Sequence, residues 1–126
     1  MAVAAMLAGC LGADDEAQPA TGAPKAIAET VQRLERATAG GEFAAICGDL
    51  LTASARRRAG GRDCARLTRS AASGIERPRI DLVAIELDGA RARVSVRTRA
   101  RGQAVASDVL VLRRERGEWR VDSLGG

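Results

Sequence analysis

The chain has 126 residues, enough for one domain, and a formal net charge of +4 at pH 7. It contains no histidine or tyrosine, and Phe43 and Trp119 are its only aromatic residues, which excludes histidine or tyrosine acid–base catalysis and nucleic-acid binding by aromatic stacking. All but one of its 20 basic residues are arginine, with no recognition-helix or zinc-finger spacing, so we expect attraction to anionic surfaces and no nucleic-acid partner.

The first nine residues, MAVAAMLAG, are uncharged and apolar or small, and Cys10 follows them directly. This outline is typical of the remnant of a secretory signal peptide. Residues 7–10, LAGC, resemble the bacterial lipobox, in which small residues precede a cysteine that becomes acylated after cleavage. The alternative is a short N-terminal helix with an incidental cysteine, because no Lys or Arg precedes the apolar run. The lipobox predicts a lipid anchor at Cys10, on the extracytoplasmic face of the cell membrane.

Residues 11–23, LGADDEAQPATGA, are rich in Ala, Gly, Asp and Pro and show no hydrophobic periodicity. Such a composition predicts a disordered tether. We therefore divide the chain into a signal-peptide remnant (1–9), a lipidated cysteine with its tether (10–23) and a single folded domain (24–126). Two or three acyl chains, at about 0.8 kcal/mol per buried methylene, hold a protein stably at a membrane.

Helices are expected in the first half of the domain. Ile27, Val31 and Leu34 recur at helical spacing and predict a helix over 24–39 that Gly40 ends. Two further stripes predict a short helix over 42–51, continued by a turn over 52–58, and another over 62–73. The stripe residues are Phe43, Ile46, Cys47 and Leu50 in the first of these, and Cys64, Leu67 and Ala71 in the second.

Beyond Pro78 the apolar period changes from about 3.6 to about 2, which predicts strands. We expect an antiparallel meander over 79–87, 90–101, 104–113 and 118–124, with a hairpin turn at Asp88-Gly89. The apolar phase of the first strand shifts between Leu82 and Val83, so a bulge, or burial on both faces, is expected there. Helices followed by an antiparallel sheet make this an α+β fold. The side chains expected to point inward include Ala92, Val94, Val96, Trp119 and Val121.

Cys47 and Cys64 lie on consecutive predicted helices and are expected to face inward. An oxidising compartment favours a disulfide between them, worth about 3 kcal/mol for a loop of this size. Two buried free thiols are the alternative. Zinc would need two more ligands in a chain without histidine, so we expect no metal site and no cofactor.

The second predicted strand carries a row of arginines on its outward face. One interpretation is a solvated sheet face on which Glu86, Asp88 and Asp108 pair some of the cations. The other is a docking surface for anionic lipid headgroups, wall polymer or an acidic protein partner. The row consists of Arg91, Arg93, Arg97, Arg99 and Arg101. A separate run over 56–58 is interpreted as a helix end, where cations suit the dipole.

Asp81 and Asp108 are the candidate pocket acids. Both lie in predicted strands, from which a side chain can point into the interior, and a buried carboxylate is suited to proton transfer. A solvated strand face is the alternative for both. The serines of the chain lack a histidine that could activate them, so no nucleophile is expected.

The order of short helices and then a sheet that closes on a Trp-containing strand resembles the nuclear transport factor 2-like superfamily over residues 24–126. The segments that carry the resemblance are KAIAETVQRLERATAGGEFAAICGDLL, LLTASARRRAGG and GEWRVDSLG. It implies N-terminal short helices packed on a curved antiparallel sheet of about four strands, a cone whose open end can hold a small apolar ligand. Enzymatic members carry acidic, Tyr or His side chains inside the cone. Without His or Tyr, that chemistry is not carried over to this chain.

These observations lead to the expectation of a membrane-tethered extracytoplasmic binding or interaction domain without catalytic activity. The alternative is a small-molecule-binding or enzymatic cone that uses a buried Asp81 or Asp108. Folds of this type can dimerise through the open sheet face, which here would carry the arginine row. We therefore expect a monomer, with a dimer as the alternative.

Overall fold

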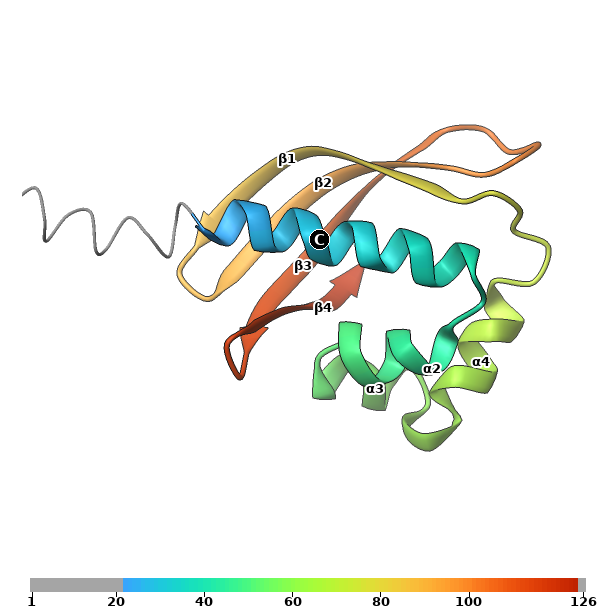
Figure 1. Cartoon of the computed structure of the whole chain (residues 1–126), viewed down its shortest axis with the longest axis horizontal. Coiled ribbons are helices and arrows are strands. Elements are labelled where there is room, and N and C mark those ends of the chain that lie inside the picture. Colours follow the sequence, from blue (N-terminus) through green and yellow to red (C-terminus); the bar gives the residue numbers. More distant parts are fainter. Residues whose placement is uncertain (1–21, 125–126) are drawn as a thin grey trace, which may run out of the picture.

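The computed structural model describes residues 22–124, in which one long helix lies across a four-stranded antiparallel sheet (Figure 1). Within these residues the helix occupies 22–39, so it includes two residues ahead of the expected start at Pro24. Pro24 lies in the first turn, where its missing N–H costs no hydrogen bond. Cys10, the lipobox and most of the predicted tether lie outside the described residues.

A group of short helical segments follows the long helix and packs beside it (Figure 1). The helix expected over 42–51 is present, but it widens into a π-type turn in which the N–H of Leu51 donates to the carbonyl of Ile46 at 3.0 Å. The helix expected over 62–73 begins as a 3-10 turn and ends at Ala71. The segments are α2 (Phe43–Ala45), η1 (Ile46–Leu50), α3 (Ala53–Arg58), η2 (Gly61–Asp63) and α4 (Cys64–Ala71).

The sheet is the expected meander, with its strands in the order β1-β2-β3-β4. In β1, Leu82 pairs with Val96 and Ala84 with Ser95, which leaves Val83 as the extra residue of a bulge and confirms the phase shift in the sequence. The connection between β2 and β3 is longer than expected, so Arg101 lies beyond the end of β2. The strands are β1 (Arg79–Asp88), β2 (Arg91–Arg99), β3 (Ala106–Glu115) and β4 (Glu118–Leu124). The α+β class is confirmed, with the element order that the nuclear transport factor 2-like resemblance implies.

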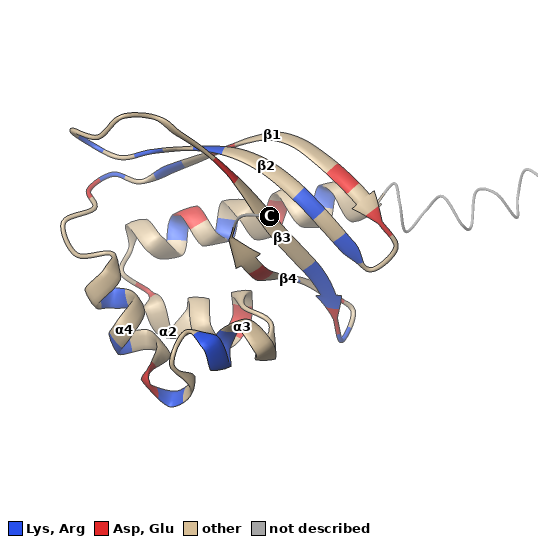
Figure 2. Ribbon diagram, turned by 180° about the vertical axis from the view of Figure 1, so that it is seen from behind, with Lys and Arg blue, Asp and Glu red and all other residues tan. Residues whose placement is uncertain are grey.

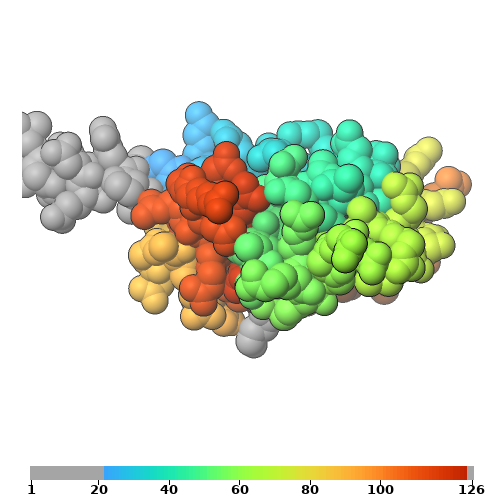
Figure 3. Space-filling model, turned by 90° about the horizontal axis from the view of Figure 1, so that it is seen from below, coloured from blue at the N-terminus to red at the C-terminus, as the bar shows by residue number. Residues whose placement is uncertain are grey.

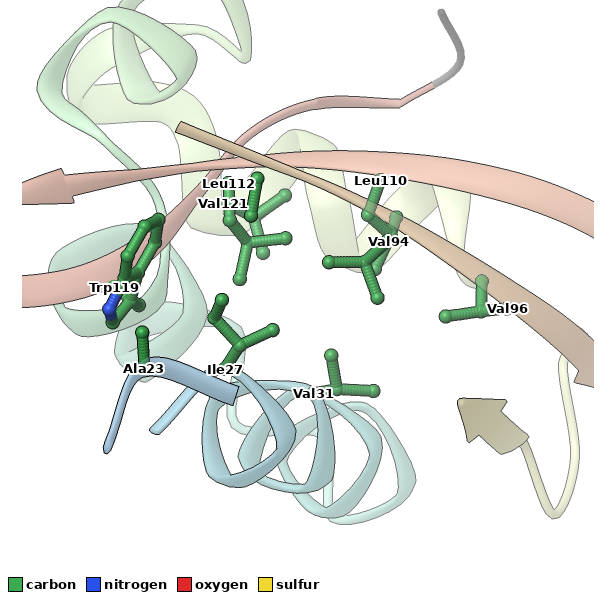
Figure 4. Close-up of a cluster of buried hydrophobic side chains, with 10 residues drawn as sticks. Ala23, Ile27, Val31, Val94, Val96, Leu110, Leu112, Trp119 and Val121 are labelled. Carbon is green, nitrogen blue, oxygen red and sulfur yellow. The ribbon is translucent and has the colours of Figure 1, made fainter. Parts of the chain in front are cut away.

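The main hydrophobic core lies between the long helix and the inner face of the sheet (Figure 4). Ile27 on the helix and Val94 and Leu112 on the sheet have no exposed surface. This confirms the expected inward faces of β2 and of the long helix. The only buried polar side chains among residues 22–124 are those of Thr30 and Thr52. The other members of the cluster are Ala23, Val31, Ala92, Val96, Leu110, Trp119 and Val121.

Both edge strands of the sheet have partners from outside it. Beside β4, Leu51 forms a parallel bridge with Val121, and the N–H of Thr52 donates to the carbonyl of Val121 at 2.9 Å. Beside β1, the N–H of Ile80 donates to a carboxylate oxygen of Glu35 on the long helix at 2.6 Å. These contacts fix the helical segments to the two sides of the sheet.

Asp122 connects α3, β3 and β4 through one carboxylate. Thr52 Oγ1 donates to its Oδ1 at 2.7 Å, Arg113 Nε donates to its Oδ2 at 3.2 Å, and Arg58 Nη2 lies 3.9 Å from Oδ1. Burial raises the pKa of Asp122, but the hydrogen bonds from Thr52 and Arg113 and the charges of Arg113 and Arg58 outweigh it. The pKa of Asp122 is therefore lower than that of an ordinary aspartate.

This lowered pKa predicts a pH dependence of stability. A carboxyl whose pKa is lower in the folded state stabilises the fold above its unfolded pKa of about 3.9, and the contribution is lost as the pH falls through the folded pKa. We expect Asp122→Asn to unfold at lower urea concentration than wild type near neutral pH, and the difference to shrink in acid. Glu76→Gln, at an exposed side chain, serves as control. An unchanged difference across this pH range would contradict the role assigned to Asp122.

Candidate anion-binding cleft

The two candidate pocket acids are not buried in the structure. Asp81 lies on the outer face of the sheet, opposite Arg97, and pairs with Arg99 Nη2 at 2.9 Å. Asp108 is exposed and accepts a hydrogen bond from Thr98 Oγ1 at 3.1 Å. Neither residue lines any of the four clefts described for residues 22–124. The bulge at Val83 does not turn Asp81 inward, because strand alternation already places that side chain outside.

Basic residues of β2 lie next to acidic residues of β1 in the sheet (Figure 2). The arginines of β2 are exposed and alternate with buried residues, so the row lies on the outer face. The register places Glu86 opposite Arg93 and Asp88 opposite Arg91, so oppositely charged side chains face each other across the strands. Asp108 was expected to pair with a member of this row. In the register it lies opposite the inward-facing Val96, so it is on the other face of the sheet from the row. Arg101 does not belong to the row because it lies in the β2–β3 connection.

A disulfide joins Cys47 to Cys64, which confirms the expected pairing. Their Cα atoms are 6.1 Å apart, and both residues are buried. The bond connects η1 to the start of α4.

A cleft of about 460 Å³ lies next to this disulfide, between the short helical segments and the β3–β4 hairpin. Cys47, Gly48 and Leu51 form one part of its wall, and Gly61 forms another. The hairpin and the helical segments lie side by side on the face shown in Figure 3, in orange-red and green. The charged lining residues are Arg56, Arg57, Arg62, Arg116, Arg120 and Glu115.

Four of the cleft arginines have no ionic partner among residues 22–124, since no described carboxylate oxygen lies within 4.0 Å of their nitrogens. Arg56 and Arg57 come from the last turn of α3, Arg62 from η2, and Arg116 from the β3–β4 turn. All four are exposed, so their guanidinium groups remain hydrated and available to a ligand. Separate elements therefore bring like charges to one cleft.

Arg120 is the most buried of these arginines, with its side chain only 20% exposed. Its Nη1 donates to the carbonyl of Gly48 at 3.0 Å, and its Nη2 donates to Glu118 at 3.1 Å. Its Nε is buried and has no hydrogen-bond partner among the described residues. A buried donor without a protein partner is a position where a ligand or water supplies the missing acceptor.

Among residues 22–124, Glu115 is the only acidic one that lines the cleft. Its carboxylate oxygens lie 3.2 and 3.4 Å from the N–H of Ala53, which donates to them. Thr52 caps the same helix by accepting from the N–H of Ala55 at 3.0 Å. Glu115 is thereby held by α3, and its one negative charge opposes five positive ones.

The disulfide braces two parts of the cleft wall. Cys47 itself lines the cleft beside Gly48, whose carbonyl holds Arg120. Arg62, on another part of the wall, lies two residues before Cys64. The bond therefore limits how far these two segments can separate, and a site with fixed donors binds a ligand at a smaller entropic cost.

The chemistry of this cleft is recognition of negative charge. Guanidinium groups donate hydrogen bonds to phosphate or carboxylate oxygens in a planar fork and stay charged at any physiological pH. No group of three or more His, Cys, Asp or Glu residues suited to a metal ion occurs among residues 22–124. No serine or threonine from the described part of the chain lines the cleft as a nucleophile.

This site was not predicted from the sequence. Arg56, Arg57 and Arg58 do form the last turn of α3, as expected, but Arg56 and Arg57 also line the cleft, whereas Arg58 turns to Asp122. The available signal was the density of arginine over residues 56–62, in which Gly60 and Gly61 precede Arg62. The pattern gave no indication that the hairpin with Arg116 and Arg120 would lie against it.

No protein-family model and no curated protein matches this chain. Among solved structures, one similar chain is described as "De novo designed NTF2 fold protein NT-9". It is 17% identical, with 77% of this chain and 79% of that chain covered, at a TM-score of 0.48. A likeness of this degree carries no argument about function, so the assignment below rests on the residues of the cleft.

Proposed function

We propose that this protein is a non-catalytic binding module, of nuclear transport factor 2-like fold, that holds an anionic group in its arginine cleft. We further propose that lipidated Cys10 tethers it to the extracytoplasmic face of the cell membrane. The observation that carries the binding role is the convergence of five arginines from α3, η2 and the β3–β4 hairpin, opposed among the described residues by Glu115 alone. The partners are then the membrane and an anionic surface or protein group.

The cleft supports this role better than the arginine row of β2 does. The row lies on a sheet face beside Asp81, Glu86 and Asp88 of the neighbouring strand, and Asp81 pairs with Arg99. The cleft is concave and brings five arginines from separate elements together, so a multiply charged anion can contact several of them at once. Charge-assisted hydrogen bonds of this kind are about twice as strong as neutral ones.

The tether rests on the sequence LAGC at residues 7–10 and on the disulfide. A persistent disulfide is expected in a compartment outside the cytoplasm. No helix among the described residues is long and apolar enough to cross a membrane. An acylated Cys10 supplies the attachment in this proposal.

Paired charge-removal variants test the cleft. We expect Arg56→Gln/Arg57→Gln to bind pyrophosphate about tenfold more weakly than wild type, a loss of about 1.4 kcal/mol, because two unpaired cations leave the site. The control is Arg91→Gln/Arg93→Gln, which removes the same charge from the outer sheet face and should change affinity less than about twofold. Isothermal titration calorimetry at two salt concentrations measures both. Equal losses in the two variants would show that net charge, and not the cleft, attracts the ligand.

Mass spectrometry of the protein extracted from native membranes tests the anchor. We expect a chain that begins at Cys10 and carries acyl groups, since two or more chains are needed for stable attachment. Cys10→Ser should abolish the acyl mass and release the protein from the membrane fraction. An unacylated chain that retains residues 1–9 would refute the tether and leave the cleft proposal standing.

A further inference from the structure

The arginine cleft carries a positive charge that the described part of the chain does not neutralise. Its charged lining residues are five arginines and one glutamate, a formal excess of four positive charges. The glutamate, Glu115, is already engaged by the N–H of Ala53. Like charges gathered in one cleft repel each other and attract any anionic group that is held nearby.

The chain itself carries such a group. Asp14, Asp15 and Glu16 are consecutive, and theirs are the only charged side chains among residues 1–22. Glu16 lies six positions before Gly22, the first described residue. Six residues reach at most about 20 Å when extended. The three carboxylates are therefore confined to a small volume around the start of the domain.

The start of the domain lies beside one wall of the cleft. Ala23 belongs to the same core cluster as Trp119, and Figure 4 draws the two next to each other. Trp119 lies directly before Arg120 and three residues after Arg116, both of which line the cleft. Figure 3 shows the blue start of the long helix against the orange-red hairpin, with the green helical segments on its other side.

We infer that the segment Asp14–Glu16 docks in the arginine cleft of its own domain and competes there with external anions. This inference rests on the proposed anion-binding function of the cleft. Three negative charges offset most of the formal excess of four on the cleft wall, and the short connection to Gly22 gives them an effective concentration of order millimolar. Exposed ion pairs are individually weak, so the docked segment is displaced by salt or by a tighter anion. The segment thus raises the threshold at which the cleft accepts a ligand.

A label on the full chain tests the contact directly. Cys47 and Cys64 are paired in the disulfide, so in the full chain produced without acylation Cys10 is the single free thiol and takes a nitroxide spin label four residues from Asp14. We expect selective broadening of the amide resonances of Gly48 and Gly117 at low salt, and its loss at high salt. Asp14→Asn/Asp15→Asn/Glu16→Gln should abolish the broadening. The control, Glu76→Gln/Glu86→Gln/Asp88→Asn, removes the same charge from exposed positions outside the cleft and should retain it.

Affinity for pyrophosphate tests the competition. The variant without the three carboxylates, here called the tether variant, is expected to bind pyrophosphate about tenfold more tightly than wild type. The reason is that the acidic segment, at an effective concentration of order millimolar, no longer competes for the cleft. The affinity of the control variant should stay within about twofold of wild type. Equal affinity of wild type and tether variant, with no broadening at the cleft, overturns the inference and leaves the proposed function intact. Absence of pyrophosphate binding in every variant refutes the proposed function instead. In that case the broadening measured with the labelled chain still tests whether the segment docks in the cleft.

Two other results of the labelling would also overturn the inference. Broadening centred on the outer face of β2 would place the acidic segment on the arginine row. Broadening of an isotope-enriched chain by the label on a second, unenriched chain would show that the contact is between two molecules. Dilution of the mixed sample separates this last case from docking within one chain, because an intramolecular contact does not depend on concentration.

Discussion

Replacing both Cys47 and Cys64 by serine is expected to lower the free energy of unfolding by about 3 kcal/mol. The disulfide closes a loop between residues 17 apart and connects η1 to α4, in a domain whose only aromatic side chains are one Phe and one Trp. Both sulfur atoms lie near Thr68 Oγ1, at 3.9 and 3.7 Å, so the serine hydroxyls have a neighbour to bond and the loss is mainly that of the crosslink.

Thermal unfolding of the oxidised, reduced and double-serine proteins measures this effect. For a domain of about 100 residues, 3 kcal/mol corresponds to a fall in Tm of roughly 15 °C. The reduced wild type should match the double variant, and Cys10→Ser should match the oxidised wild type. If reduction leaves Tm unchanged, the crosslink does not stabilise this domain. Reduction should also weaken pyrophosphate binding, because the bond braces two parts of the cleft wall.

Ile27→Ala is expected to lower the free energy of unfolding by about 3 kcal/mol, within the range for replacing a buried isoleucine by alanine and leaving a cavity. Ile27 is 0% exposed and belongs to the cluster through which the long helix packs on the sheet (Figure 4). Its neighbours come from both layers, so they cannot collapse into the space without moving the helix.

Urea unfolding with a matched surface variant checks this second effect. Leu124→Ala removes an aliphatic side chain that is 77% exposed, and it should change the free energy of unfolding by less than about 0.5 kcal/mol. Equal effects of the two variants would mean that the helix–sheet layer does not form the stabilising core. Neither substitution touches the arginine cleft, so pyrophosphate affinity should be retained below the unfolding transition.

The fold was largely predictable because its periodic patterns are local. The alternation in β2 places Ala92, Val94 and Val96 inside, and the phase shift at Val83 appears in the structure as a bulge. A strand has one inner and one outer face, so a change of phase in the sequence has few structural solutions. The same reasoning found the stripe of the long helix.

Predictions failed where the surroundings of an element decide the outcome. Leu67 was expected to face inward but is 43% exposed, whereas Cys64 of the same predicted stripe is buried. Beside Leu67, Gly60 has a φ of 118°, which favours glycine, and a Cβ there would displace Leu67 Cδ1, 2.5 Å away. The π-type turn of η1 was not predicted either, since the sequence still shows a helical stripe there.

The cleft could not be predicted for a related reason. Arg56 and Arg116 are 60 positions apart, and what brings their segments together is the parallel bridge between Leu51 and Val121. No local period encodes a contact between an extended dipeptide and the edge of a strand. The acids of the sheet were considered as pocket residues, but a contact between strands gives Asp81 another role. Asp81 and Arg99 neutralise each other across neighbouring strands.

The contacts at the two edges of the sheet also affect how closely copies of this protein can be crowded together without aggregating. An open edge strand is a template on which another chain can add a strand, and this is a common route to aggregation. Here Thr52 uses the carbonyl of Val121 on one side, and Glu35 takes the N–H of Ile80 on the other, where the bulge at Val83 also interrupts the edge. Copies that the proposed anchor concentrates on a membrane surface would therefore meet without edges that are ready to join into a continuous sheet.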